Sequence, residues 1–143
     1  MNNRLNSNRH AKYNLTYHLV VVTKFRKECI SNEIYSDLNI HFKRLLKGKG
    51  CKLLEFGGEK DHIHIMFSTP PQVQLSKVVN SLKTSTSRLI RRDYGDYLNH
   101  FYSKKYFWSR SYCIVSTGGA SIEVVKKYIE NQDRCNLSPP KSN

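Results

Sequence analysis

Two histidines set among hydrophobic residues, and a tyrosine followed one helical turn later by a glutamine, are the residues of this chain best suited to chemistry. The histidines lie in Lys-Asp-His-Ile-His-Ile-Met-Phe at 60–67, and the second pair is Tyr128 and Gln132. Alternate side chains of a strand point to the same side, so His62 and His64 would present two imidazoles together. Residues four apart in a helix share a face, so the tyrosine and the glutamine would lie one above the other. Imidazoles, an amide oxygen and a phenol are enough for metal-assisted attack on a phosphodiester.

Two imidazole ligands leave coordination positions open, which favours a catalytic ion over a structural zinc. A tyrosine hydroxyl has an ordinary pKa of about 10 and is therefore a weak nucleophile at neutral pH. A divalent ion can polarise the phosphate and stabilise the leaving oxygen, and a phosphotyrosine conserves bond energy for later rejoining. This chemistry suits strand breaking and joining better than one-way hydrolysis. Two simpler interpretations stay open: hydrogen-bonded histidines on a half-buried strand, and a tyrosine at the edge of the core.

The charge of the chain indicates a polyanionic partner. Its 143 residues include 24 Lys and Arg against 11 Asp and Glu, a net charge of +13, and nucleic acid is the commonest large polyanion. Its 4 cysteines form no Cys-x-x-Cys pair, which argues against a zinc finger or a disulfide framework. The polar N-terminus predicts no signal peptide, and no apolar run has the length of a membrane span. We therefore expect a protein of the reduced cytosol that binds nucleic acid and no membrane.

Cationic side chains concentrate on one expected helix face and in the aromatic segment that follows it. Serines and threonines interleave with the helix face, and their hydroxyls also contact phosphates. In the segment, cations alternate with Tyr102, Tyr106, Phe107 and Trp108, a mixture suited to stacking on unpaired bases. The alternatives are a solvated helix face and, for Phe107 and Trp108, packing in the core. The candidate DNA-binding residues are Lys77, Lys83, Arg88, Arg91, Arg92, Lys104, Lys105 and Arg110.

Hydrophobic periodicity and chain-breaking residues predict the elements that position these groups. Alternating apolar residues predict strands, and a spacing of three and four predicts helices. Ser31 is expected to cap the first helix, Gly57-Gly58 to form the turn of a hairpin, and Pro70-Pro71 to end the histidine strand. The expected strands are 13–24, 51–56, 62–69 and 111–117, and the expected helices are 31–47, 72–92 and 121–134.

The order of these elements predicts an α+β fold. It is the β-α-β-β-α-β order of a ferredoxin-like, RRM-like antiparallel sheet with both helices on one face. An additional C-terminal helix is expected to carry Tyr128, and the open face needs to be occupied by a ligand, a partner or an additional helix. The expected organisation is a flexible basic arm over 1–12, a single domain over 13–135 and a flexible tail over 136–143.

Taken together, the motifs resemble those of the small single-tyrosine HUH transposases, the TnpA-type enzymes of insertion sequences that move as single-stranded DNA. The resemblance rests on Lys-Asp-His-Ile-His-Ile at 60–65, Ser-Thr-Gly-Gly-Ala at 116–120 and Val-Val-Lys-Lys-Tyr-Ile-Glu-Asn-Gln at 124–132. It covers nearly the whole chain, with the motifs in the family's order. Each motif alone is unspecific, whereas the set is specific.

The resemblance implies a role for each of four residues. His62 and His64 are expected to bind the metal ion, Mg²⁺ or Mn²⁺, with Gln132 as the third ligand, and Tyr128 is expected to be the nucleophile. The implied function is that of a DNA transposase of the HUH endonuclease class. An enzyme of this class is a metal-dependent single-stranded DNA endonuclease and strand transferase that acts through a 5′-phosphotyrosine intermediate.

The resemblance also implies partners and a location. Single-stranded DNA with subterminal hairpins at the element ends is the expected substrate, and a homodimer is expected whose active site can be shared between subunits. The expected location is the prokaryotic cytosol, with action at the nucleoid. Two alternatives stay open: a domesticated relative that processes repeated palindromes, and a non-catalytic single-strand nucleic-acid-binding module. A histidine-triad nucleotide hydrolase is disfavoured, because Met66 stands where its third histidine would be.

Overall fold

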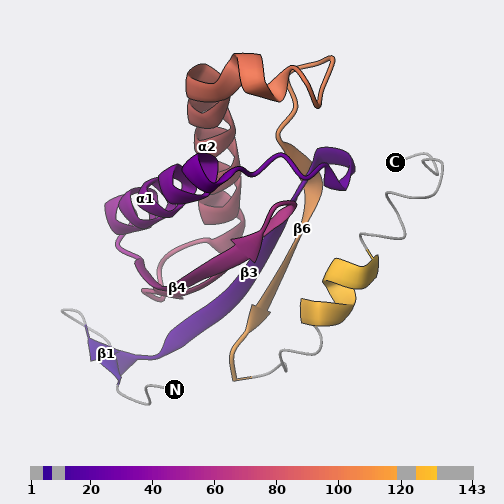
Figure 1. The fold of residues 1–143 in the computed structure, drawn as a ribbon. Helices are drawn as coiled ribbons and strands as arrows, with labels where there is room; N and C mark the ends of the chain where they lie inside the picture. The colour runs from indigo at the N-terminus through magenta and orange to yellow at the C-terminus, as the bar shows by residue number, and fades with distance from the viewer. Residues whose placement is uncertain (1–4, 8–11, 119–124, 132–143) are drawn as a thin grey trace.

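The computed structural model describes residues 5–7, 12–118 and 125–131, and its centre is a four-stranded sheet (Figure 1). The strand order is β4-β5-β3-β6, and every neighbouring pair is antiparallel. The expected antiparallel α+β fold is therefore confirmed. The strands are β3 (Leu15–Thr23), β4 (Lys52–Glu59), β5 (His62–Thr69) and β6 (Trp108–Ser116).

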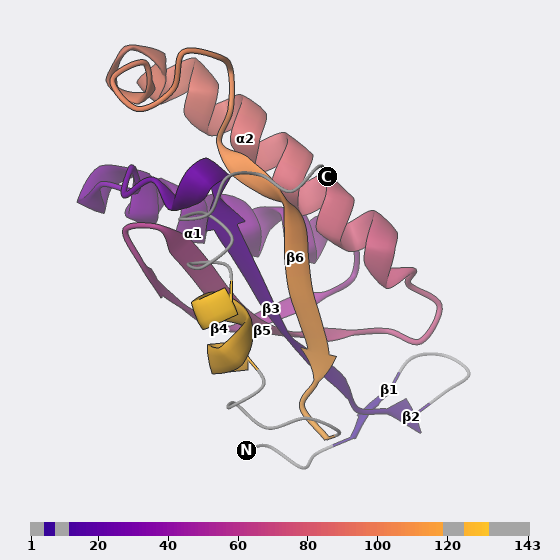
Figure 2. The same cartoon turned by 90° about the vertical axis from the view of Figure 1, so that its right-hand side faces the viewer.

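Two helices, α1 (Asn32–Gly48) and α2 (Leu75–Leu98), cover one face of this sheet (Figures 1 and 2). Ser31 caps α1 as expected, because its side chain accepts a hydrogen bond from the Ile34 backbone N–H at 3.2 Å. Such a cap contributes about 1 kcal/mol to stability. The side chains that the helices bury are Ile34, Leu38, Phe42 and Leu46 of α1, and Val78, Val79, Leu82, Thr86, Leu89, Ile90 and Leu98 of α2.

Strict alternation divides the side chains of the two central strands between the faces of the sheet. Leu19 and Val21 of β3 and Ile63, Ile65 and Phe67 of β5 are buried beneath the helices. Burial of each such side chain contributes about 1.5–3 kcal/mol. Because this hydrophobic set specifies the register, the intervening residues of β5, including both histidines, must project from the opposite face.

A short helix over 125–131 lies on that opposite face (Figure 2). It packs on β3 and β6 through a small hydrophobic cluster separate from the main core. The longer helix expected over 121–134 has both of its ends outside the described residues. The members of the cluster are Val20, Val22, Cys113, Val115, Val125, Tyr128 and Ile129.

The hairpin between β4 and β5 turns at Lys60 and Asp61, so the turn predicted at Gly57-Gly58 is wrong. Both glycines lie inside β4 and pair with β5. Asp61 holds the turn position because its backbone oxygen accepts a hydrogen bond from the Thr23 N–H at 2.9 Å. Gly57 and Gly58 therefore belong to an irregular part of β4, and contacts with β3 determine where the hairpin turns.

The second helix and the last strand both extend beyond their predicted limits. α2 begins at residue 75 and continues through a break in helical geometry at Tyr94 to Leu98, whereas its pattern predicted 72–92. Leu98 is fully buried, so packing of the last turn against the core outweighs the break. β6 begins at Trp108, three residues before its predicted start, because Phe107 and Trp108 are buried in the core.

The chain ends contribute little to this architecture in the residues that are described. Asn6–Ser7 (β1), within the arm predicted over 1–12, pair with Lys12–Tyr13 (β2), where this arm meets the predicted domain. The tail predicted over 136–143 lies outside the described residues. None of the helices in the described part of the chain is long and apolar enough to cross a membrane.

Candidate functional site

His62 begins β5 and projects onto the face that carries residues 125–131. It is only 8% exposed, and its Nδ1 lies 2.8 Å from Oδ1 of Asp61. A carboxylate at Nδ1 fixes the orientation of the ring and holds the proton on that nitrogen, which leaves the Nε2 lone pair available. This environment is the one that a metal-binding histidine requires.

His64 lies two residues along the same strand and faces a third histidine that the sequence did not single out. Its Nε2 is 3.0 Å from Nδ1 of His18 on β3, and the two rings stack with their centroids 5.1 Å apart. Burial lowers the pKa of His64, and the neighbouring His18 lowers it further. The His64 imidazole is therefore neutral at pH 7 and able to act as a ligand.

Tyr128 reaches the same face from the helix over 125–131. Its ring is half-buried beside the hydrophobic cluster, and its hydroxyl donates a hydrogen bond to Ser111 Oγ at 3.1 Å. Ser111 belongs to β6, and only β3 separates β6 from the histidine strand. Two strand spacings amount to roughly 10 Å between the backbones of β5 and β6. The structure thus brings His62, His64 and Tyr128 onto one side of the sheet.

The donors on this face fit part of a metal site. Within residues 5–7, 12–118 and 125–131, no group of three or more His, Cys, Asp or Glu has the arrangement of a complete metal site. His62 and His64 supply two neutral nitrogen donors, and Asp61 orients the first of them. Gln132, the expected third ligand, lies outside the described residues. The described donors are thus compatible with an ion that retains open positions for substrate.

Gly58 of β4 lies directly against the His62 backbone, and we expect this position to tolerate no larger side chain. Its φ is +149°, and a Cβ built there would lie 2.3 Å from the carbonyl oxygen of His62. Gly58→Ala is therefore expected to destabilise the protein by about 1–3 kcal/mol and to displace His62. The loss would be measured from urea unfolding midpoints.

The matched control for this substitution is Gly57→Ala, because no atom lies within 4 Å of a Cβ at Gly57. This variant is expected to unfold at a urea concentration close to that of the wild type. Equal unfolding midpoints for Gly58→Ala and Gly57→Ala would show that the close approach to His62 is not a constraint.

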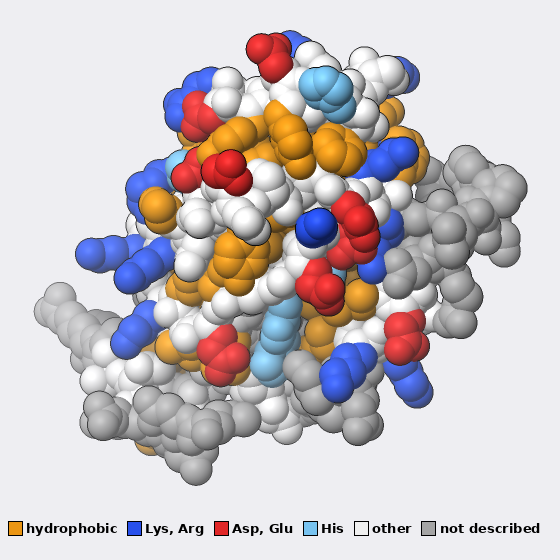
Figure 3. All heavy atoms as spheres, in the orientation of Figure 1, with side chains coloured by type: hydrophobic (Ala, Val, Ile, Leu, Met, Phe, Trp, Pro, Cys, Tyr) orange, Lys and Arg blue, Asp and Glu red, His pale blue; other side chains and the backbone are white. Residues whose placement is uncertain are grey.

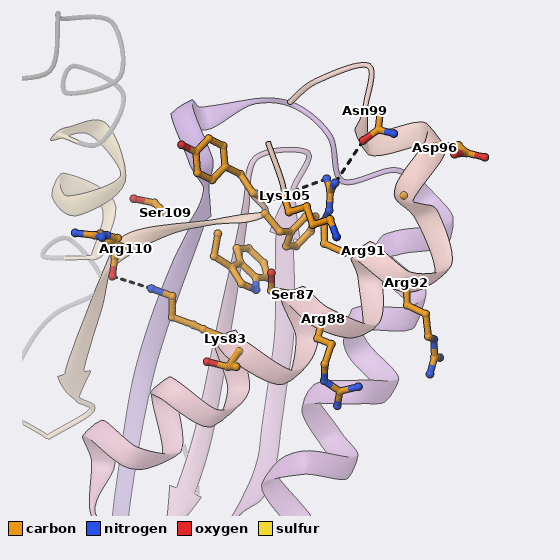
Figure 4. A pocket seen from close by; sticks show the side chains of 15 residues that line it. Lys83, Ser87, Arg88, Arg91, Arg92, Asp96, Asn99, Lys105, Ser109 and Arg110 are labelled. Carbon is orange, nitrogen blue, oxygen red and sulfur yellow. Dashed lines mark hydrogen bonds between the residues drawn. The ribbon is translucent and has the colours of Figure 1, made fainter. Parts of the chain in front are cut away.

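A basic pocket lies between α2 and the segment that leads into β6 (Figure 4). It has a volume of about 830 Å³ and is lined by six of the eight candidate DNA-binding residues. Lys77 and Lys104 do not line it, and the prediction for these two therefore gains no support from the pocket. The six cationic residues are Lys83, Arg88, Arg91, Arg92, Lys105 and Arg110, and Asp96 is the single carboxylate among the lining residues.

The six cations differ in how far they are engaged by the protein itself. Lys83 Nζ donates to the backbone oxygen of Arg110 at 2.8 Å, and burial lowers the pKa of Lys83 to about 8. Arg91 donates to the backbone oxygen of Tyr106 at 3.4 Å. Figure 4 shows Arg88 extending outward from α2, and among the described residues its side chain has no hydrogen-bond or ion-pair partner. Lys83 and Arg91 therefore help to shape the pocket, while Arg88 is available to a ligand.

The aromatic residues of this segment are mostly structural, which corrects the expectation that they stack on bases. Tyr102, Phe107 and Trp108 are buried, and the Trp108 indole donates to Thr86 Oγ1 at 2.9 Å. Tyr106 is half-buried and its ring packs edge-on against that of Tyr102. The core interpretation of Phe107 and Trp108 is thus confirmed. Tyr106, Phe107 and Trp108 also line the pocket, where they stand beside its six cations.

Four residues of the site have no assigned role in the sequence-based interpretation: His18, Arg26, Asp61 and Ser111. The alternation of β3 places His18 on the face opposite Leu19, and this alternation is the feature of the sequence that could indicate a role for His18 in the site. Its position beside His64 depends on the β3–β5 register, in which His18 pairs with Met66. Arg26 belongs to a left-handed turn, with Phe25, that no local pattern predicts. Figure 3 shows histidine side chains (pale blue) reaching the surface between acidic and hydrophobic groups.

Comparisons with known sequences point to one family. The family model described as "Transposase IS200 like" matches residues 11–132. The chain is 29% identical over 123 residues to the transposase for insertion sequence element IS200 of Salmonella typhimurium, covering 86% of this chain and 80% of the relative. It is 26% identical over 120 residues to the ISDra2 transposase TnpA of Deinococcus radiodurans, covering 84% and 85% of the two chains.

Solved structures share the fold. A crystal structure from Deinococcus radiodurans R1, described as that of a transposase, superposes with a TM-score of 0.81 at 24% identity and covers 89% of this chain and 97% of its own. A REP-associated tyrosine transposase bound to a REP hairpin superposes with a TM-score of 0.53 at 11% identity, covering 87% and 69%. At these identities the likeness establishes the architecture alone.

Proposed function

This chain belongs to the IS200-like transposase family, whose members cleave and rejoin DNA, and from that premise we propose that Tyr128 is the residue that attacks the DNA. The observation that carries this proposal is the position of Tyr128 on the sheet face that also presents His62 and His64. No described carboxylate or cysteine group on this face offers a competing metal site. The proposed substrate is single-stranded DNA.

The proposed reaction is a transesterification at phosphorus. The Tyr128 oxygen forms a bond to the scissile phosphorus as the bond to the 3′ oxygen breaks. The phenol loses its proton, the 3′ oxygen gains one, and the products are a 5′-phosphotyrosine and a free 3′-OH. In the reverse direction, a 3′-OH attacks the phosphotyrosine, which rejoins the strands and restores the tyrosine. No net hydrolysis occurs, which suits an enzyme that moves DNA.

We propose that His62 and His64, together with Gln132, hold Mg²⁺ or Mn²⁺. When bound, such an ion supplies charge that polarises the phosphate. Asp61 orients the ring of His62, and burial together with His18 keeps the ring of His64 neutral, which leaves one of its two nitrogens unprotonated. Ser111 holds the Tyr128 hydroxyl near the face before DNA arrives.

The basic pocket is the proposed binding surface for the DNA backbone. Ser109 and Arg110 line the pocket on β6, and the next residue of that strand, Ser111, contacts the Tyr128 hydroxyl (Figure 4). A strand of DNA that leaves the pocket over the β6 edge would therefore pass Tyr128. A DNA hairpin is the proposed ligand of the pocket, as a relative of the same fold is bound to a REP hairpin.

Arg88→Ala is expected to weaken hairpin binding and to make it less sensitive to salt. Each phosphate contact contributes close to one unit to the slope of log affinity against log salt, so the slope should fall by about 1. Fluorescence anisotropy with hairpin oligonucleotides from the DNA that flanks the gene would measure both quantities.

Lys43→Ala is the control for general charge, because Lys43 is an exposed cation on α1 that does not line the pocket. Its salt slope is expected to equal that of the wild type. Equal slopes for Arg88→Ala and Lys43→Ala would contradict the proposal that the pocket binds the DNA backbone. They would not affect the proposal that Tyr128 is the nucleophile.

We propose a homodimer in the prokaryotic cytoplasm as the working form. In this chain the helix over 125–131 packs on its own sheet. Mixing Tyr128→Phe with His64→Ala protein tests whether the site is also completed between subunits. Restored activity in the mixture would require a tyrosine and a histidine from different chains, whereas an inactive mixture would place both in one chain.

The proposed function is tested by incubating the protein with Mg²⁺ or Mn²⁺ and 3′-labelled single strands tiled across both flanks of the gene. A labelled species that migrates with the protein under denaturing conditions is expected on at least one strand. It should be absent with EDTA. Absence of any such adduct across all strands and both ions would refute the proposal.

A further inference from the structure

The guanidinium group of Arg26 lies between the two halves of the candidate site. On one side, its Nε and one terminal nitrogen lie 3.1 and 2.9 Å from Oδ2 of Asp61. On the other side, its second terminal nitrogen donates to the backbone oxygen of Ile129 at 2.8 Å. Ile129 follows Tyr128 directly in the helix over 125–131. The Arg26 side chain therefore contacts both the turn that precedes β5 and the helix over 125–131, which we call the tyrosine helix.

The position of Arg26 is fixed by an unusual backbone. It ends the short 3₁₀ turn η1 (Lys24–Arg26) after β3, and both Phe25 and Arg26 have positive φ, +58° and +55°. Residues other than glycine adopt this conformation only where surrounding contacts enforce it. Here the Lys24 N–H donates to the Phe107 oxygen at 2.8 Å, and the Tyr102 hydroxyl donates to the Lys24 oxygen at 2.7 Å. Hydrogen bonds to core residues thus hold the turn in the conformation that directs the Arg26 side chain toward Asp61 and Ile129.

Asp61 links Arg26 to His62 on the face of the sheet that is proposed to bind the metal ion. Its Oδ2 accepts from Arg26, while its Oδ1 lies 2.8 Å from His62 Nδ1. The side chains of Arg26 and Asp61 are only 10% and 17% exposed, so solvent screens their contact less than that of a surface pair. The orientation of the carboxylate, and with it that of the His62 ring, therefore depends on the guanidinium.

The contact with Ile129 gives the helix a polar attachment in addition to its packing. Among the residues that the structure describes, the hydrophobic cluster that holds residues 125–131 on the sheet has three buried members, Val20, Val22 and Val125. Hydrophobic packing is not directional, whereas a charge-assisted hydrogen bond at 2.8 Å specifies one position of the backbone. Together with the hydrogen bond from Tyr128 to Ser111, this contact specifies where on the sheet the helix, and with it Tyr128, is held.

We propose that Arg26 is a positioning residue that fastens the tyrosine helix and His62 to each other, so that docking of the helix and orientation of the imidazole are coupled. The proposal rests on the proposed roles of Tyr128 and His62. Arginine is suited to this task because its planar fork bonds a carboxylate through two nitrogens and leaves a third for the carbonyl. A lysine at the same position offers a single nitrogen and cannot hold both partners in this geometry.

Three variants separate the two contacts: Arg26→Gln removes both, Arg26→Lys is expected to keep the charge near Asp61 alone, and Asp61→Asn leaves the contact with Ile129 in place. Hydrogen exchange of amides over 125–131, on metal-free protein, reports helix docking. Calorimetric titration with Mn²⁺ reports the His62 side. Arg44→Gln is the matched control, because Arg44 is an exposed arginine of α1 whose side chain hydrogen-bonds His41 and no other residue in the described part of the chain.

Arg26→Gln is expected to speed exchange over 125–131 by about tenfold or more and to weaken Mn²⁺ binding by about 10–100-fold. Asp61→Asn should weaken Mn²⁺ binding to a similar extent while exchange over 125–131 stays at the wild-type rate. Arg26→Lys should speed exchange yet bind Mn²⁺ better than Arg26→Gln. Arg44→Gln should match the wild type in both measurements.

The proposal is overturned if Arg26→Gln and Arg26→Lys both match Arg44→Gln in exchange and in Mn²⁺ affinity. It is also overturned if Asp61→Asn speeds helix exchange as much as Arg26→Gln, because the effect would then be general loosening. Should Arg26→Gln fail to fold, the comparison of Arg26→Lys with Asp61→Asn decides the matter alone. Wild-type protein that forms no DNA adduct would defeat the proposed function instead, whatever the exchange data show.

Discussion

Replacing Tyr128 by phenylalanine is expected to abolish the covalent protein–DNA adduct, lowering its rate of formation by about 10³-fold or more. The substitution removes the hydroxyl that donates to Ser111 Oγ, and it keeps the ring that packs beside Val20 and Val22. Because the ring provides the packing, the fold and the docking of the helix should be preserved. The loss can then be assigned to the missing nucleophile and is measured on denaturing gels with 3′-labelled single strands.

Tyr97→Phe is the control for removing a phenolic hydroxyl. Tyr97 lies on α2 with 36% of its surface exposed, and its ring contact with Phe101 does not need the hydroxyl. This variant should form the adduct at the wild-type rate. A Tyr128→Phe protein that still forms the adduct would identify a different nucleophile and would leave the tyrosine helix without its proposed role.

Replacing His62 or His64 by alanine is expected to weaken Mn²⁺ binding by at least about 100-fold, since loss of a direct ligand should exceed the 10–100-fold cost of losing an outer partner. Adduct formation should fall with it. The basic pocket is formed by α2 and the segment leading into β6, so hairpin affinity without metal should stay unchanged. Calorimetric titration and fluorescence anisotropy measure these two properties separately.

His100→Ala is the control for the general effect of removing an imidazole. His100 is exposed after α2 and hydrogen-bonds only the Tyr97 backbone oxygen among the described residues. It should bind Mn²⁺ with wild-type affinity. If His62→Ala and His64→Ala also bound Mn²⁺ like the wild type, the paired imidazoles would be structural and another ligand set would hold the ion.

Elements with strong periodicity could be predicted from the sequence because burial specifies them. β5 and α1 match their predicted ranges to within a residue, since Ile63, Ile65 and Phe67 alternate without interruption and Ser31 provides a cap. The turn of the β4–β5 hairpin cannot be predicted from Gly57-Gly58, because glycine is typical both of turns and of irregular strands. Contacts distant in sequence, such as that of Thr23 with Asp61, select between the two.

The candidate site could be predicted only as far as its motifs reach. The His-Ile-His alternation places two imidazoles on one face whatever the rest of the fold does. His18 could not be placed beside His64 without the β3–β5 register. Arg26 could not be assigned either, because its role depends on two left-handed residues in a turn and on a carbonyl 103 positions away.

The open sheet face also bears on the alternative of a non-catalytic RNA-recognition module. Such a module presents aromatic side chains on its central strands for base stacking. Here the central strands β3 and β5 present His18, His62 and His64 on that face, and the helix over 125–131 covers part of it. This arrangement favours a catalytic surface over a stacking platform.

The most direct measurement is the mass-spectrometric location of the DNA adduct after trypsin digestion of the protein. Cleavage after Lys127 releases a peptide over 128–134 that contains a single tyrosine. A metal-dependent 5′-phosphotyrosine link on Tyr128, and on no other residue, is the predicted result. An adduct carried by any other peptide would contradict the account.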